Sequence, residues 1–162
     1  MKKIFPFILV FISVVIFFNQ TITKGLIPIP ADDIVGLYHP FRDLYANDYP
    51  RGIPFKNPLI TDPVRQQYPW KQLVINIEKK GELPIWNPYE MGGKPLLANF
   101  QSAAFYPLNI IFFPLPFELA WSLYIILQPF LAFFFCYFFL RNIKISLIGS
   151  LFGGFVFSFS GF

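Results

Sequence analysis

The chain alternates apolar runs with one long polar segment, and the first apolar run covers residues 4–23. This run holds no charged residue and follows a basic start at Lys2 and Lys3. About twenty residues at ~1.5 Å per residue cross the roughly 30 Å of hydrocarbon in a bilayer. We therefore predict a first transmembrane helix within residues 1–23. The alternative is a signal peptide, but no small-residue cleavage site follows and the run is long for one.

Two further apolar runs predict two further helices. Residues 118–141 form the second transmembrane helix, which Pro129 is expected to kink. Residues 145–162 start a third transmembrane helix. The small residues that would form its packing face are Gly149, Gly153 and Gly154. Because the third run has no polar end, we expect the chain to be the amino-terminal part of a longer membrane protein.

Residues 24–117, between the first two runs, are predicted to form a long ordered loop. Its repeated prolines and its Gly-Gly pair fix turns and exclude long helices. The loop also carries large aromatic side chains that need burial, namely Trp70, Trp86, Tyr89, Phe100, Phe105 and Tyr106. A segment that is both apolar and rich in turns is expected to fold compactly.

Two helical stretches are predicted inside this loop. Residues 34–44 form a helix that Pro40 breaks into two short pieces. Residues 70–80 form an amphipathic helix that ends at Gly81. Its apolar face consists of Leu73, Val74 and Ile77. Its charged residues, Lys71 among them, are placed away from that face.

Composition and charge place the apolar runs in a membrane. More than half of the residues are apolar, and 23 of 162 are Phe. Residues 24–118 hold nine basic and nine acidic residues, so the net charge of +4 comes from Lys2, Lys3, Arg141 and Lys144. This is the positive-inside pattern, and it argues against a nucleic-acid-binding surface. It predicts a cytoplasmic amino terminus and an extracytoplasmic loop over residues 24–117.

The candidate chemistry of this sequence rests on carboxylates of the loop. No glycine-rich phosphate loop, His/Cys metal spacing or nucleophile-elbow motif is present. Asp32 and Asp33 follow the first apolar run by about ten residues, which keeps them near the membrane surface. A carboxylate there can act as a general base on a hydroxyl or ligate a divalent cation that bridges a phosphate. The residue types by themselves favour the alternative, an N-cap for the following helix.

Asp62 is the other candidate carboxylate. Pro63 follows it, and this pair is typical of an N-cap and a first helical position, so the capping alternative holds there too. Arg65 and Gln66 come about one turn later. An Arg at this place can bind a phosphate or a carboxylate.

Two segments of the loop carry a resemblance to a known family. NPLITDPVRQQYPW (57–70) and GELPIWNPYEMGGKPLLANFQSAAFYPLN (81–109), together with the acidic pair after the first helix, resemble the amino-terminal region of bacterial YfhO-like membrane proteins. These are large multi-pass proteins similar to the GT-C class of glycosyltransferases. The resemblance implies an all-α integral membrane fold with an ordered first outer loop that bears an essential acidic residue.

The same resemblance implies transfer of a sugar from a polyprenyl-phosphate carrier in the bacterial cell membrane to a cell-envelope acceptor. Asp32 and Asp33 match the family's loop carboxylates by position, Asp62 is the third candidate catalytic residue, and Asp33 is the candidate ligand of a divalent cation such as Mg²⁺ or Mn²⁺. The residues expected to contact substrate are Arg65, Gln66, Trp86, Asn87, Tyr89, Lys94 and Gln101. Among these, Arg65 and Lys94 are expected at phosphate, and Trp86 and Tyr89 at sugar or lipid. The alternative is a non-enzymatic membrane scaffold, or a lipid-handling or transport protein, whose outer loop binds a partner.

Overall fold

The computed structural model describes residues 5–52 and 59–160, and this part of the chain is mostly helical. The chain divides into two compact units. Residues 5–28 and 116–160 form one unit, named the helical unit below, and residues 29–52 and 59–115 form the other, named the loop unit. The division follows the predicted boundary between the apolar runs and the loop.

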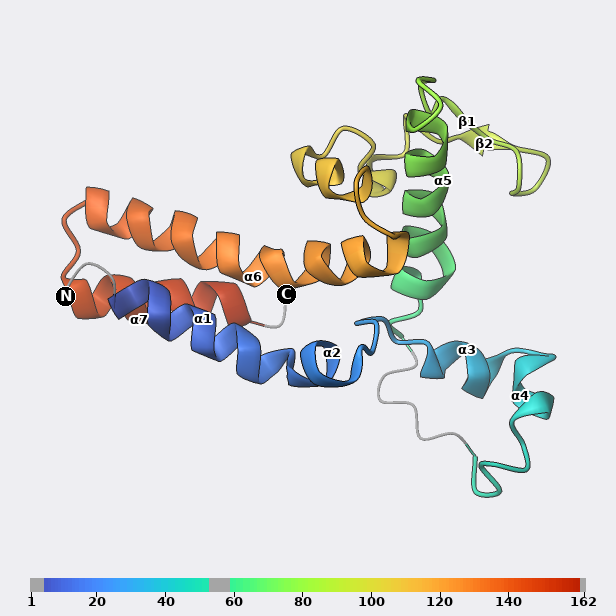
Figure 1. Ribbon diagram of the computed structural model, residues 1–162, viewed down its shortest axis with the longest axis horizontal. Helices are drawn as coiled ribbons and strands as arrows, with labels where there is room; N and C mark the ends of the chain where they lie inside the picture. Colours follow the sequence, from blue (N-terminus) through green and yellow to red (C-terminus); the bar gives the residue numbers. More distant parts are fainter. Residues whose placement is uncertain (1–4, 53–58, 161–162) are drawn as a thin grey trace. The chain divides into compact units, whose positions relative to one another are not determined.

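The first apolar run forms two helices instead of the predicted one. α1 spans Phe5–Phe17 and α2 spans Asn19–Lys24, with Phe18 between them (Figure 1). Phe18 has φ −98° and ψ 24°, which lies outside helical geometry. The side-chain amide of Asn19 donates to the carbonyl oxygen of Ile16 at 2.7 Å, and such a local bond competes with the helical backbone ladder. The first four residues of the predicted segment lie outside the described part of the chain.

The second and third apolar runs form α6 (Phe117–Asn142) and α7 (Leu147–Phe159). Ser146 caps α7, because its hydroxyl accepts a hydrogen bond from the Gly149 amide at 3.1 Å, and the helix therefore starts later than predicted. Within the described part of the chain, α6 is the helix that has the length and apolar composition to cross a membrane. α1 and α7 are apolar but shorter. The predicted end of the third helix, residues 161–162, lies outside the described residues.

α1, α6 and α7 lie side by side in the helical unit (Figure 1). Their shared core consists of Val10, Val14, Phe133 and Tyr137. Two glycines of α7 allow close packing, since a Cβ on Gly154 would lie 3.0 Å from the Phe133 ring and a Cβ on Gly153 would overlap Leu140. The small-residue face predicted for α7 is confirmed at these two glycines. Gly149 instead faces the start of its own helix.

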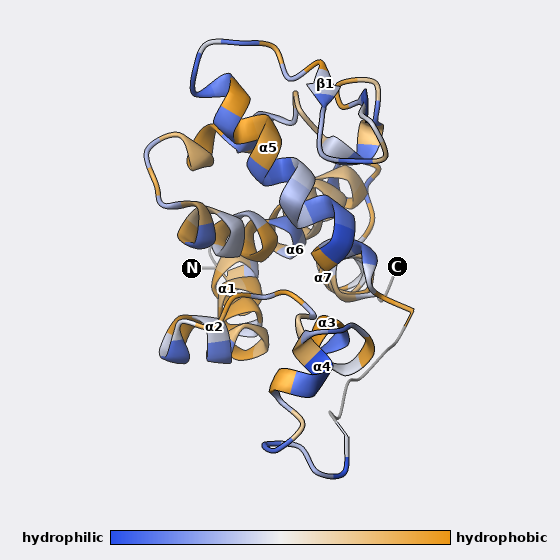
Figure 2. Ribbon diagram, turned by 90° about the vertical axis from the view of Figure 1, so that its right-hand side faces the viewer, coloured by the Kyte–Doolittle hydropathy of each residue, from blue (hydrophilic) through white to orange (hydrophobic). Residues whose placement is uncertain are grey.

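These helices consist largely of apolar residues, as the ribbon of α1 in Figure 2 illustrates, and many of their large apolar side chains are exposed. Large side chains more than half exposed include Phe11, Phe17, Phe139, Phe152 and Phe157. Extended apolar surfaces of this kind mark contact with a membrane or with a partner protein.

In the loop unit, the predicted helix 34–44 is two short helices. α3 spans Asp32–Leu37 and α4 spans Phe41–Leu44. Pro40 stands directly before α4, so the predicted break at this proline is confirmed.

The amphipathic helix of the loop unit is longer than predicted and begins with a π-helical turn. The turn, η1, spans Pro63–Gln67, and α5 continues from it over Tyr68–Glu78. Apolar and polar residues alternate along α5 in Figure 2. Gly81 has φ +78° and its amide donates to the carbonyl oxygen of Glu78 at 2.9 Å, which confirms the predicted stop.

A small hairpin, which the sequence did not predict, packs against α5. Its strands are β1 (Trp86–Asn87) and β2 (Lys94–Pro95), paired antiparallel. Residue 93 must be glycine, because it has φ +103° and a Cβ there would overlap the Trp86 ring. The 3₁₀ segments η2 (Phe100–Ser102) and η3 (Pro107–Phe112) complete the unit. Its core cluster holds Trp70, Val74, Leu96 and Ala104.

Lys71 lies inside this unit, contrary to the prediction that it faces away from the apolar side of the helix. Only 3% of its surface is exposed. Its Nζ donates to the carbonyl oxygen of Ala103 and to Oδ1 of Asn109, both at 2.9 Å. The amide of Asn109 in turn donates to the carbonyl oxygens of Ala103 and Ala104. Lys71 and Asn109 therefore fasten the segment between η2 and η3 to α5.

Candidate functional site

Asp33 is the most unusual carboxylate that the structure describes. It lies in the first turn of α3 and is 1% exposed. Neither of its carboxylate oxygens accepts a hydrogen bond from residues 5–52 or 59–160. Buried polar groups normally have partners, and leaving one without them is costly. An ion, a proton or a substrate hydroxyl would supply the missing partner.

The structure contradicts the N-cap alternative for the acidic pair. Ala31 occupies the N-cap position of α3. The first i→i−4 bond of the helix starts there, since the Val35 amide donates to the Ala31 carbonyl oxygen at 3.4 Å. Asp32 and Asp33 are thus the first two helical residues, and no side chain caps α3. Asp32 is half-buried, so only its neighbour is sealed from solvent.

Asp62 takes the predicted N-cap position before Pro63, but it makes no side-chain capping bond. Its backbone is already helical, with φ −56° and ψ −40°. The amides of Val64 and Arg65 both donate to the Thr61 carbonyl oxygen, which satisfies donors that a cap would otherwise reach. The exposed Asp62 carboxylate is therefore available to solvent.

A cavity of about 420 Å³ opens where η1, α5 and the hairpin meet. It lies within the ~300–1,000 Å³ range of small-molecule sites. Its lining combines an arginine, three side-chain amides, a carboxylate and two aromatic rings with apolar residues: Arg65, Pro69, Trp70, Gln72, Leu73, Asn76, Asn87, Tyr89 and Glu90. Three residues predicted to contact substrate, Arg65, Asn87 and Tyr89, are therefore brought together.

Glu90 is held in place by three neighbours at the edge of this cavity. The Trp70 indole N–H donates to its carboxylate, and Lys94 forms an ion pair with it. The Lys94 ammonium also lies 4.3 Å from the Trp70 ring centroid. Desolvation raises the pKa of the Glu90 carboxyl, but hydrogen bonds with Lys94, Trp70 and Asn87 outweigh it and hold the pKa below its usual value. Glu90 is thus a fixed acceptor, and the charge of Lys94 is already balanced.

Arg65 connects the cavity with the end of α3. Its guanidinium carbon lies 5.3 Å from the centroid of the Tyr38 ring, and Tyr38 is the C-cap of α3. Stacking on a ring leaves the edge N–H groups of the guanidinium free to bind an anion. No other cation lies among the cavity-lining residues that the structure describes.

The four other predicted contact residues, Lys94 among them, lie outside the cavity lining. Trp86 covers Gly93 and is half-exposed. Gln101 is exposed, and its backbone amide donates to the Asn99 side chain at 3.1 Å. Gln66 lies half-buried in η1.

Trp70 and Glu90 belong to this site but were not among the predicted site residues. Glu90 and Lys94, four residues apart across a Gly-Gly pair, form an ion pair that the sequence did not predict. The indole of Trp70 is twenty residues from its acceptor, a contact that only the tertiary fold creates.

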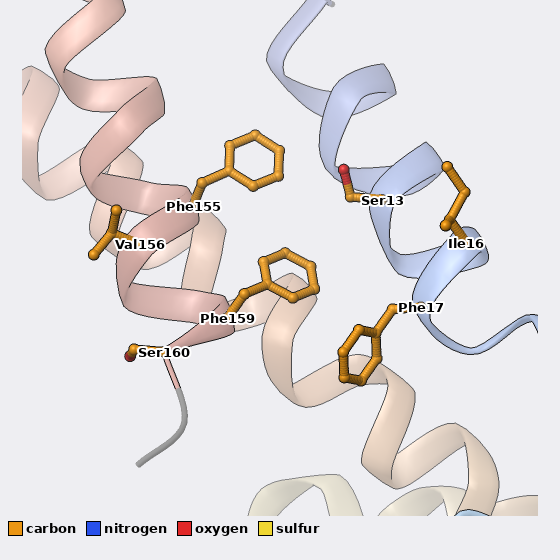
Figure 3. A pocket seen from close by; sticks show the side chains of 7 residues that line it. All are labelled: Ser13, Ile16, Phe17, Phe155, Val156, Phe159 and Ser160. Atoms are coloured by element: carbon orange, nitrogen blue, oxygen red, sulfur yellow. The ribbon is translucent and has the colours of Figure 1, made fainter.

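The helical unit contains a second hollow of about 620 Å³ between α1 and α7 (Figure 3). Phe155, Phe159 and Phe17 line it with their rings. Its two hydroxyls are already bonded to their own helices, Ser13 to Leu9 at 3.0 Å and Ser160 to Phe157 at 3.1 Å. The hollow therefore suits an apolar occupant and offers no chemistry of its own.

No cluster of three or more His, Cys, Asp or Glu side chains suited to a metal ion occurs in residues 5–52 and 59–160. No protein-family model, curated protein or solved structure matches this chain. The resemblance carried by the two loop segments therefore stays a prediction.

Proposed function

We propose that this chain is part of a multi-pass bacterial inner-membrane glycosyltransferase that transfers a sugar from a polyprenyl-phosphate carrier to a cell-envelope acceptor. The observation that carries the proposal is the sealed Asp33 carboxylate, whose oxygens lack partners among the described residues. The resemblance of the loop to GT-C-like proteins supports the same reaction.

In this proposal Asp33 is the general base. The acceptor hydroxyl gives its proton to the Asp33 carboxylate while its oxygen bonds to the anomeric carbon of the donor sugar. The bond between that carbon and the carrier phosphate breaks, and the phosphate leaves with the electron pair. Only 1% of the Asp33 surface is exposed, which excludes bulk water that would otherwise compete as the acceptor.

A divalent cation fits the chemistry of Asp33, since its two unpartnered oxygens are hard ligands. When bound, Mg²⁺ or Mn²⁺ would neutralise the carrier phosphate. Asp33 is the residue that would hold it.

The packing of the helical unit supports the proposed membrane topology. The Phe7 ring of α1 lies 6.2 Å from that of Phe138 near the end of α6. The Phe17 ring at the other end of α1 lies 5.9 Å from that of Phe159 near the end of α7. The start of α1 thus lies at the same end of the unit as the basic turn that begins at Arg141. Basic residues at one end of a helix set favour that end inside the cytoplasm.

The same topology places the loop unit outside. Asp33 follows α2 by nine residues, because α2 ends at Lys24. A chain of that length reaches at most about 30 Å, so Asp33 stays within reach of lipid headgroups.

The proposal is tested with membranes from cells that express the complete reading frame. Incubation with radiolabelled polyprenyl-phosphate sugars should transfer label to an envelope polymer. Membranes from cells without the gene serve as the control. If the radiolabel in the envelope polymer does not exceed this control for any of the carrier sugars tested, the enzymatic proposal is refuted.

The second candidate is a non-enzymatic scaffold or lipid-handling protein whose outer loop binds a partner. Large apolar side chains that remain exposed on the loop unit favour it, namely Tyr89, Met91, Phe100 and Phe105. This candidate predicts that a partner protein copurifies with the intact chain and is lost from the Phe100→Ser variant. It also predicts no dependence on Asp33.

A further inference from the structure

We propose that the cavity beside α5 binds a sugar ring that bears a carboxylate, as a hexuronate unit does. The inference rests on the proposed function for its role, since the bound glycan would be the acceptor. In this proposal Arg65 contacts the carboxylate of the sugar, and not the carrier phosphate that was expected for it from the sequence.

The polar lining of the cavity matches the hydroxyls of a sugar. Amides of Gln72 and Asn76 are exposed on neighbouring turns of α5. Each amide offers both donors and acceptors, as vicinal hydroxyls require. The Glu90 carboxylate, held by Trp70 and Lys94, adds a fixed acceptor. Tyr89 is 82% exposed and supplies an aromatic face for the ring.

The positive charge in the cavity lining favours an acidic sugar over a neutral one. The Glu90 charge is balanced by Lys94, which leaves Arg65 as the uncompensated charge of the lining. A guanidinium binds a carboxylate through two parallel hydrogen bonds. Its position over the Tyr38 ring restrains the guanidinium before binding, so less side-chain freedom is lost when a ligand binds.

The test is direct binding of two matched trisaccharides to the whole protein in lipid nanodiscs, measured by calorimetry. Cellotriose and the β-1,4-linked glucuronate trimer differ only at C6. The uronate trimer should bind saturably and at least about tenfold more tightly than cellotriose. Equal affinity for the two, or no saturable binding of the uronate, would overturn the proposal.

Variants locate the binding. Arg65→Gln should lower the affinity for the uronate at least about tenfold, whereas Arg42→Gln, at another exposed arginine of the loop unit, should leave it unchanged. Gln72→Ala and Asn76→Ala change exposed side chains and should each weaken both trisaccharides severalfold. Equal effects of Arg65→Gln and Arg42→Gln would place the binding elsewhere and sink the assignment.

Binding and transfer separate the two proposals. Binding without transfer would defeat the glycosyltransferase proposal and leave the glycan site standing. Transfer to envelope polymer without uronate binding would defeat the glycan-site proposal and leave the glycosyltransferase proposal standing.

Discussion

Lys71 should make the stability of the loop unit depend on pH. Burial lowers the pKa of its ammonium group from 10.5 to about 8, while the negative charge of Glu78 acts in the opposite direction. In the unfolded chain the ordinary pKa of 10.5 applies. Between these two values the unfolded state binds more protons, so stability rises with pH through the window from about 8 to 10.5.

The size of this rise follows from the difference between the two pKa values. At about 1.4 kcal/mol per pKa unit, it amounts to about 3 kcal/mol of unfolding free energy. The conversion applies because Lys71 is almost fully buried and solvent screens it little. Below pH 8 both states hold the proton, and the stability contributed by this group no longer changes.

The assay is urea unfolding of the complete chain in detergent micelles, followed by tryptophan emission at several pH values from 7 to 10.5. Other groups titrate in this range, so the informative quantity is the difference between the unmodified protein and Lys71→Met. Methionine keeps the length of the side chain and removes the ammonium group. Lys79→Met, at an exposed lysine about two turns later, is the control and should keep the full pH dependence.

A rise that persists unchanged in Lys71→Met would show that the buried ammonium is not its source.

Two further outcomes are expected. Gly93→Ala should destabilise the chain by about 1–3 kcal/mol and shift tryptophan emission, because its backbone has φ +103° and its Cβ would overlap Trp86. Gly92→Ala, with φ +85° and open space, should cost stability without the emission shift, and identical spectra for the two variants would refute the contact. In intact cells with Cys136 removed, an impermeant thiol reagent should label Met91→Cys and not Asn142→Cys; the reverse pattern would invert the proposed topology.

The sequence predicts helices well where packing and pattern agree. α6 follows from an uninterrupted apolar run, and the break before α4 follows from Pro40. The hairpin was not predicted, because its strands are two residues each and too short for any alternation to show. The break between α1 and α2 at Phe18 depends on one side-chain hydrogen bond from Asn19. A single bond of this kind cannot be recognised in the hydropathy pattern.

In the candidate site too, local spacing along a helix can be predicted from the sequence, whereas contacts between distant segments cannot. Lys71 stands three and four residues before Val74 and Ile75, so helical spacing alone puts it on their buried side. Its acceptors at Ala103 and Asn109 lie 32 and 38 residues away, and only the fold reveals them.

Asp33 shows how local rules can mislead at a site. Residue preference favoured a capping role, yet the N-cap position falls on Ala31, before both aspartates. The carboxylate is thereby released from local hydrogen bonding and becomes buried without a partner among the described residues.

The transfer rate of Asp33→Asn tests the central claim most directly. Asparagine keeps the size and hydrogen-bonding capacity of the side chain but has no negative charge and cannot take the acceptor's proton. The labelled-sugar assay on membranes, normalised to the amount of protein, should show a loss of at least about 10²-fold for Asp33→Asn. Asp32→Asn, at the half-buried neighbour, should lose far less. Near-normal transfer by Asp33→Asn would contradict the account and leave this buried carboxylate without a catalytic role.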